Sequence, residues 1–482
     1  MEIIFIIGSY ILASLTIILF RRQRNIAKVT SVVVSIFAFI ESMKVALKVA
    51  STGAYSFMFF SIDSLGAIMM LIIAVIGIVT TIYSLQYFIQ EKAKNIIGST
   101  RIKQYFVLLS LFFSAMFLAV TSNSPILSWI AIEGTTLSTA FLISLYNKSS
   151  AIEAAWKYLI INSIGLLLGF FGTLLYFIPV TSLLENGGLI TWQVLATNAV
   201  HLDPLISKIA FIFVLIGYGT KVGLVPMHTW KPSAYTKAPT PLGALLSGAL
   251  LPVAFTIILR FKLITDTTIG PIFGQNLLIG FGLISIVFVS FVILALNNYK
   301  RLLAYSSIEN AGMITLGFGF GKAGIMAALL HTIYHSLVKS SLFLSSGNIL
   351  LKYHSARLKD VRGVMKVLPL TAICFTIGFL AITGTPPFGM FLTKILIMTA
   401  GIKNYPIVSV IILLSTALLF IGFFKHTSAM IFGEKPEGVQ SGEISIWLVI
   451  PQILLLGIFI ILSFYIPPFL QKLLNDVAVS FP

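Results

Sequence analysis

Apolar residues fill this chain in long runs that short polar connections separate. Each run is about 17–25 residues long, the length that an α-helix needs to cross the hydrocarbon core of a bilayer. We therefore expect an all-α, polytopic membrane protein with about 14 transmembrane helices. The expected helix cores are residues 3–20, 29–49, 65–89, 105–121, 124–145, 155–178, 207–226, 240–260, 275–297, 303–321, 323–350, 367–384, 405–430 and 445–467.

The two ends of the chain carry no strong signal of separate segments. The first apolar run has no basic stretch before it and no small-residue cleavage site, and Arg21, Arg22 and Arg24 follow it. We expect it to be a retained helix and not a cleaved signal peptide. Near the other end, residues 471–479 predict one short interfacial turn and no long lateral helix.

Glycine and proline interrupt two of the runs. Gly223 and Pro226 break the seventh, and Pro386 and Pro387 break the twelfth. Each break falls in the fourth of five consecutive spans, and five spans per half would insert the halves with opposite orientation, as in the inverted repeats of many transporters. The predicted division is a three-helix segment (1–100), a first repeat (101–265), a second repeat (266–430) and a C-terminal helix (431–482).

The net charge of +17 reflects membrane topology more than a nucleic-acid partner. With the N-terminus outside, 20 of the 32 Lys and Arg residues lie near the inner ends of the spans, 8 lie near the outer ends, and 4 lie within spans. Such a bias follows the positive-inside rule and predicts that both termini are outside. The apolar fraction of 58% excludes a soluble domain, so the lipid bilayer is the expected environment.

The single cysteine limits the chemistry that the chain can perform alone. Cys374 excludes an internal disulfide, a cysteine-ligated iron–sulfur cluster and a zinc site built from several thiolates. We expect no cofactor and no redox centre in this chain.

Several ionisable residues lie inside the predicted spans, where burial of a charge is costly and usually marks an ion path. We predict that Glu133 is a proton relay and that Lys221 is a proton valve whose charge responds to its carboxylate partner. The alternatives are a structural hydrogen bond for Glu133 and a cap of the carbonyls at the break for Lys221. Lys157 follows Glu153 at i, i+4, so it is either an ordinary ion pair or part of the relay.

His331, His335 and Lys339 follow one another at i, i+4 and i+8, on one helical face. Because histidine titrates near neutral pH, we predict a proton wire; the alternatives are packing and a metal pair, which would lack a third ligand. Lys394 follows the second break and is predicted to be an exit site, with a snorkelling lysine as the alternative. Glu309 and Asn310 are expected near a span end in structural roles.

Five stretches of the chain together resemble the antiporter-like subunits of respiratory complex I and its relatives. Two motifs, residues 301–309 and 335–347, are most similar to the hydrogenase-4 component F type, whose members belong to membrane-bound nickel–iron hydrogenase complexes, including formate hydrogenlyase-like ones. The resembling stretches are Trp129–Thr136, Gly217–Ser247, Lys300–Gly317, His331–Gly347 and Gly384–Leu396.

This resemblance implies 14 helices, inverted five-helix repeats and broken helices seven and twelve. It implies that Glu133 and Lys221 form a first charged pair, that the two histidines and Lys339 form a central polar axis, and that Lys394 ends the second half. It also implies partners, namely other membrane subunits and peripheral iron–sulfur and nickel–iron subunits, in a prokaryotic cell membrane.

One departure from the resembling family lies in the eighth span. Many relatives carry lysine or histidine there, whereas residues 241–259 contain no ionisable side chain and Ser247 and Thr256 are its polar residues. A link between the two halves would need water or hydroxyls at this position.

The sequence is therefore interpreted as a proton-translocating, or else sodium-translocating, subunit of a redox-driven complex. The main alternative is a subunit of a multisubunit Na⁺/H⁺ antiporter that has no redox partner. A purely structural membrane anchor would have no reason to bury charges, and no stretch identifies a quinone site.

Overall fold

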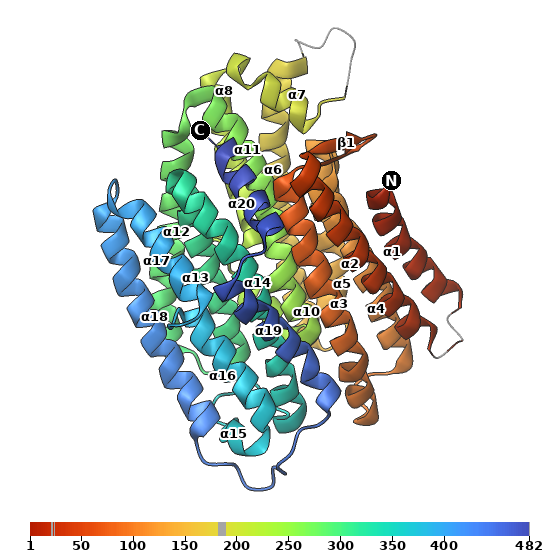
Figure 1. Cartoon of the computed structure of the whole chain (residues 1–482). Helices are drawn as coiled ribbons and strands as arrows, with labels where there is room; N and C mark the ends of the chain where they lie inside the picture. Colours follow the sequence, from red (N-terminus) through yellow and green to blue (C-terminus); the bar gives the residue numbers. More distant parts are fainter. Residues whose placement is uncertain (21–22, 24, 182–188, 482) are drawn as a thin grey trace.

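The computed structural model of this chain confirms the all-α, polytopic architecture (Figure 1). It describes every residue except 21, 22, 24, 182–188 and 482. Arg21, Arg22 and Arg24, which contribute to the predicted charge bias, lie outside the described residues.

The helices follow one another with short connections. In chain order they are α1 (Glu2–Leu19), α2 (Ile26–Thr52), α3 (Ser64–Ala93), α4 (Ser99–Thr121), α5 (Pro125–Ile143), α6 (Ser149–Thr181), α7 (Trp192–Thr197), α8 (Pro204–Val222), α9 (Lys231–Lys237), α10 (Thr240–Leu245), α11 (Leu251–Ile269), α12 (Pro271–Val292), α13 (Tyr299–Gly319), α14 (Gly321–Tyr353), α15 (Val364–Val367), α16 (Pro369–Thr383), α17 (Gly389–Ile402), α18 (Pro406–Phe432), α19 (Ile450–Phe464) and α20 (Pro468–Ser480). Short 3₁₀ turns, η1 (Ala199–His201), η3 (Ile293–Ala295) and η4 (Ile446–Leu448), and one π-helical segment, η2 (Leu246–Leu250), join some of them.

Within the described residues, ten helical segments are long and apolar enough to cross a membrane. Helices α16 and α17 are shorter apolar pieces on either side of a break. Helices α13 and α14 are not among the ten, although the sequence predicts spans there. Both helices are buried along nearly their whole length, so lipid does not require them to be uniformly apolar.

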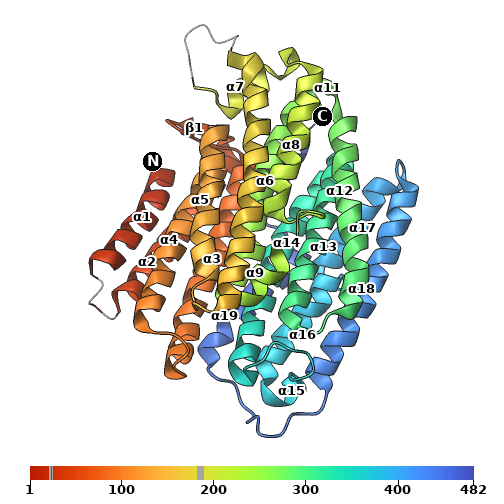
Figure 2. The same ribbon diagram turned by 180° about the vertical axis from the view of Figure 1, so that it is seen from behind.

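Helix α14 is the centre of the bundle and contacts α3, α10, α13, α16, α17 and α19 (Figures 1 and 2). Two of its hydroxyl side chains bond within the helix itself: Thr332 donates to the Ala328 carbonyl at 2.7 Å, and Ser336 donates to the Thr332 carbonyl at 2.8 Å. This local bonding lets small polar residues lie in a buried helix without an unsatisfied donor.

The last part of the chain differs from the prediction. Instead of a short interfacial turn, α20 is a 13-residue helix that packs on α2, α3 and α14. Pro467 lies directly before it, and α19 ends at Phe464, so this final pair of helices is interrupted as well. The sequence also did not predict the small hairpin of β1 (Tyr55–Phe57) and β2 (Phe60–Ile62) that follows α2.

Both termini lie toward the end of the bundle that carries α7, and α15 lies at the opposite end (Figure 1). The basic loop of residues 352–366 is at the α15 end. The assignment of this end to the inner side of the membrane, and the division into two inverted repeats, stay predictions.

Glycines allow α6 and α8 to cross with their backbones in contact, a device common between membrane helices (Figure 2). A Cβ added to Gly217 would lie 2.3 Å from the Gly169 nitrogen and 2.7 Å from the Gly165 carbonyl oxygen. Neither backbone atom can move aside as a flexible side chain can. The crossing holds the end of α8 at a fixed distance from α6.

Replacing Gly217 with alanine should therefore separate α6 from α8 and lower the free energy of unfolding by about 1–3 kcal/mol. The melting temperature of the purified protein in detergent measures this loss. Gly280→Ala on α12 is the matched control, because a Cβ there meets no atom within 4 Å. Equal melting temperatures for the two variants would show that the close crossing is not a constraint.

Candidate functional site

The first interruption of a helix places a lysine in the interior. Helix α8 ends at Val222, and Gly223 caps it in the left-handed conformation with φ +80° and ψ +44°, which favours glycine. Lys221 lies in the last turn of α8 and is 1% exposed. Its Nζ donates to the Thr136 hydroxyl of α5 at 2.8 Å and to the Tyr158 hydroxyl of α6 at 2.7 Å.

Glu133 lies one turn from Thr136 on α5 but does not form an ion pair with Lys221 in this structure. Its Oε1 accepts a hydrogen bond from the Ser163 hydroxyl at 2.7 Å, and its buried Oε2 has no hydrogen-bond partner. The two residues still interact electrostatically. Hydroxyl groups therefore lie where the sequence predicted a carboxylate contact, and Thr136 and Tyr158 are the residues that the prediction missed.

The second interruption places another lysine against a carboxylate. Helix α16 ends at Thr383, and Gly384 caps it with φ +81° and ψ +47°. Lys394 of α17 donates to Glu309 Oε1 at 3.0 Å and to the Ile382 carbonyl at 3.2 Å. Both charged side chains are almost fully buried, at 7% and 3% exposure.

This contact corrects the prediction that Glu309 lies near a span end. Glu309 is in the middle of α13, inside the bundle, and forms the buried ion pair with Lys394. The sequence contains both charged residues but does not show that they pair. They are 85 residues apart, and the contact depends on how α13 packs on α17.

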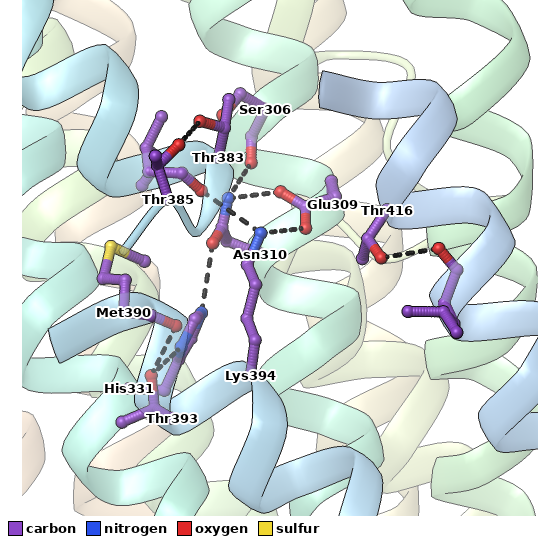
Figure 3. A network of polar contacts seen from close by, with 12 residues as sticks. Ser306, Glu309, Asn310, His331, Thr383, Thr385, Met390, Thr393, Lys394 and Thr416 are labelled. Carbon is purple, nitrogen blue, oxygen red and sulfur yellow. Dashed lines mark hydrogen bonds and ion pairs between the residues drawn. The ribbon is translucent and has the colours of Figure 1, made fainter. Parts of the chain in front are cut away.

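Asn310 connects this ion pair to the histidines (Figure 3). The Asn310 amide nitrogen donates to Glu309 Oε2 and to the Ser306 carbonyl, and its Oδ1 lies 3.1 Å from His331 Nε2. The other ring nitrogen of His331, Nδ1, lies 2.8 Å from the Thr393 hydroxyl of α17. An unbroken row of polar contacts thus runs from His331 through Asn310 and Glu309 to Lys394.

His335 and Lys339 continue the row along α14. Both side chains are fully buried, and neither ring nitrogen of His335 nor the Nζ of Lys339 has a hydrogen-bond partner among the described residues. Lys339 interacts electrostatically with Glu309 and Lys394, and His335 interacts with Lys339 and His331. Unpartnered polar groups this deep are uncommon in folded proteins and are a feature of functional sites.

Lys157 is not part of this buried row. Its ammonium lies 2.5 Å from Glu153 Oε1 on an exposed face, and the two side chains are 54% and 63% exposed. Of the two readings that the sequence left open, this geometry is that of an ordinary i, i+4 ion pair.

Three lysines that the charge distribution placed near span ends are instead buried: Lys231, Lys262 and Lys300. Lys262 pairs with Asp266 one turn along α11, and Lys300 donates to the Ala238 carbonyl at 3.3 Å. Lys231 begins α9, where a cation opposes the helix dipole, and this anomaly is the sequence signal that could have identified it.

The two helix breaks hold a lysine in the same way. A Cβ on Gly384 would lie 2.9 Å from Lys394 Cδ, and a Cβ on Gly223 would lie 2.5 Å from Lys231 Cδ. In each break the left-handed glycine leaves room for the lysine that follows the interruption. By its place relative to the break, Lys394 therefore corresponds to Lys231.

The eighth predicted span is a continuous helical path from α10 through the π segment η2 to α11, and it is buried throughout. Ser247, in η2, forms a hydrogen bond of 2.8 Å with Ser307 of α13. A Cβ on Gly248 would lie 2.1 Å from Ser340 Oγ of α14, so this helical path lies directly against α14, which carries His331, His335 and Lys339.

The whole arrangement suits proton movement better than metal chemistry. Among the described residues, no group of three His, Cys, Asp or Glu side chains is arranged to hold a metal ion. The buried row instead contains amines, imidazoles and a carboxylate, which can accept and release protons, together with hydroxyls and the Asn310 amide, which hydrogen-bond to them.

The fold and this row define a polytopic membrane protein with a charged interior, and comparisons with known proteins agree. The family described as "NADH:quinone oxidoreductase/Mrp antiporter, TM" matches residues 122–420. A relative named hydrogenase-4 component F homolog, from Methylacidiphilum infernorum, is 34% identical over 86% of this chain and 86% of its own length.

Two solved structures share the fold. A chain of the membrane-bound sulfane sulfur reductase, an archaeal respiratory membrane complex, gives a TM-score of 0.88 at 22% identity and covers 99% of this chain and 97% of its own. A chain of the Mrp complex from Dietzia sp. gives 0.86 at 17% identity, with 100% of this chain and 97% of its own covered. The chain belongs to the NADH:quinone oxidoreductase/Mrp antiporter membrane family, and it is an antiporter-like membrane subunit.

The buried ion pair offers a direct test of the site. Glu309→Gln keeps the size of the side chain but leaves the Lys394 ammonium without its counter-charge, so we expect a loss of about 3–5 kcal/mol in the free energy of unfolding. The melting temperature in detergent measures it. The matched control, Glu153→Gln, breaks an exposed pair and should leave the melting temperature nearly unchanged. Equal shifts for both variants would contradict the buried pairing.

Proposed function

We propose that this chain moves protons across the membrane as the antiporter-like subunit of a complex I-related, redox-driven complex. The observation that carries the proposal is the set of buried ionisable groups inside the bundle: Lys221 at the first break, Lys339, His335 and His331 along α14, and Lys394 at the second break. Burial of this many ionisable groups in a membrane bundle is costly and is otherwise unexplained. Because most of the groups are nitrogen bases, which bind protons, the row favours protons over sodium.

In this proposal the partner complex supplies the energy and this chain supplies the path. Each proton moved against 100 mV costs about 2.3 kcal/mol. Redox turnover would shift Lys221 between its hydroxyl contacts and the Glu133 carboxylate, whose Oε2 is free to accept a hydrogen bond. The proton would then pass along Lys339, His335 and His331 to the Glu309 carboxylate, which Asn310 holds beside His331 by its hydrogen bonds, and leave from Lys394.

Lys157 has no part in this path, because its ammonium is held by Glu153 on an exposed face. The path instead adds Glu309 and Asn310, which join His331 to Lys394 by direct contacts.

We infer the partners from the family. The similarity to a hydrogenase-4 component F homolog supports an assembly with other membrane subunits and with peripheral nickel–iron and iron–sulfur subunits in a prokaryotic cell membrane. In that membrane both termini would face outward, with the basic loop of residues 352–366 inside.

A second candidate function is that of a subunit of a multisubunit Na⁺/H⁺ antiporter. The fold similarity to the Mrp complex supports it. Purification of the tagged chain from native membranes in a gentle detergent, with partners identified by mass spectrometry, separates the two. Nickel–iron and iron–sulfur subunits would support the redox-driven complex, whereas membrane subunits without any metal centre would support the antiporter.

Lys221→Met should abolish proton uptake by sealed vesicles that contain the assembled complex, because methionine cannot carry a charge at the first break. The electron transfer of the partner to an artificial acceptor should remain. Proton uptake is followed with a pH-sensitive dye. Lys208→Met, an exposed lysine on the same helix, is the control and should leave uptake unchanged. Normal uptake in Lys221→Met would refute the role of Lys221.

A further inference from the structure

Lys231 is a buried amine that the path above does not use. It is the first residue of α9, its side chain is 1% exposed, and its Nζ has no hydrogen-bond partner among the described residues. Its Nζ lies 6.0 Å from the ring centroids of Trp230 and Tyr235. A buried ammonium without a carboxylate or carbonyl contact needs a reason other than stability.

Contacts on one side connect Lys231 with the first break. A Cβ on Gly223, two residues after Lys221, would lie 3.0 Å from Lys231 Nζ. Trp230, directly before Lys231, donates from its ring nitrogen to the Thr220 carbonyl at 2.9 Å. The Trp230 ring also lies 5.0 Å from the ring of Tyr158, whose hydroxyl accepts from Lys221.

Contacts on the other side connect Lys231 with the central axis. Lys231 interacts electrostatically with His335 and Lys339 of α14, and also with His228 in the interruption between α8 and α9. Tyr235, one turn along α9, packs edge-on against Phe343 of α14, with ring centroids 5.4 Å apart. Helix α9 therefore lies between the Lys221 cluster and the α14 row.

The adjoining helix offers no other carrier. From Thr240 to Leu259, the segment formed by α10, η2 and the first half of α11 contains no ionisable side chain. It contributes the Ser247 hydroxyl, which bonds to Ser307 of α13. A gap in ionisable groups would otherwise separate Lys221 from Lys339.

We propose that Lys231 is the proton carrier that joins the first break to the central axis. This inference rests on the proposed function and adds a residue to its path. An N–H bond of the Lys231 ammonium breaks and a new N–H bond forms on the unprotonated amine of Lys339 or the imidazole of His335. Because none of these nitrogens has a hydrogen-bond partner among the described residues, the proton crosses between them through water. The neutral Lys231 amine then takes a proton delivered from the Lys221 side. No electron changes hands, and the net charge of the pair is conserved.

The left-handed Gly223 allows this placement. Any side chain at position 223 would collide with the methylene groups of Lys231, since Cδ and Cε lie 2.5 and 2.6 Å from the Cβ position. The same device places Lys394 beside Gly384 in the other break. Each half of the protein thus holds one interior lysine against a glycine that ends a helix.

A proton carrier can be distinguished from a fixed charge by arginine. Arginine keeps the positive charge but does not release its proton in proteins. Lys231→Arg would therefore preserve an electrostatic or structural role and stop proton transfer, whereas Lys231→Met would stop both.

The test measures proton uptake per donor molecule oxidised in sealed vesicles that contain the native complex. We expect Lys231→Met and Lys231→Arg each to lower the proton uptake per donor molecule oxidised about tenfold or more. Lys237→Met, which removes an exposed lysine from the same short helix, should match the unaltered complex.

Normal uptake in Lys231→Arg would overturn the proposal, because a fixed charge would then suffice, and normal uptake in Lys231→Met would overturn it as well. If the methionine variant fails to assemble, the arginine variant decides alone by the same criterion. Absence of uptake in the unaltered complex during donor oxidation would instead refute the proposed function, so the two failures are distinguishable.

Discussion

The cost of removing charged side chains from water is the constraint on which this structure depends. A membrane bundle offers no solvent to an interior lysine, so each one must be enclosed by polar groups or by partners of opposite charge. The protein meets this requirement in two ways. Lys394 has a carboxylate in Glu309, and Lys221 has two hydroxyls. Lys339 and His335 have neither, and they lie at the centre of the row.

The helix breaks follow from the same constraint. If α8 or α16 continued without a break, its backbone would fill the space beside the next segment. A left-handed glycine at the end of each helix leaves that space open. Lys231 and Lys394 occupy that space. The glycine crossing of α6 and α8 then fixes the position of Lys221 relative to Tyr158. The left-handed glycines and the close helix crossing therefore together determine where the buried lysine amines lie.

Much of this could be predicted from the sequence, because hydropathy sets helix positions and burial cost singles out interior charges. The positions of Glu133, Lys221, His331, His335, Lys339 and Lys394 inside the bundle were predicted in that way, and their roles stay predictions. The sequence failed where the answer depends on packing between distant segments. It placed Glu309 near a span end, although the residue pairs with Lys394, and it did not single out Lys231, which is buried. The sequence left Lys157 open between an ordinary ion pair and a relay, and the exposure of both Lys157 and Glu153 is what favours the ion pair.

The sequence shows that the eighth predicted span lacks an ionisable side chain, and the structure shows which groups lie next to that span. Its hydroxyl, Ser247, reaches α13, while the ionisable group beside it comes from α9. In our proposal, Lys231 of α9 supplies the ionisable group that the eighth span lacks.

The most direct test of the central claim is to reconstitute the unaltered native complex in liposomes and record internal pH while its electron donor is oxidised. The account predicts a pH change that starts with donor oxidation and collapses when a protonophore is added. Donor oxidation at a normal rate without any pH change would contradict it, since the buried row would then have no proton to carry.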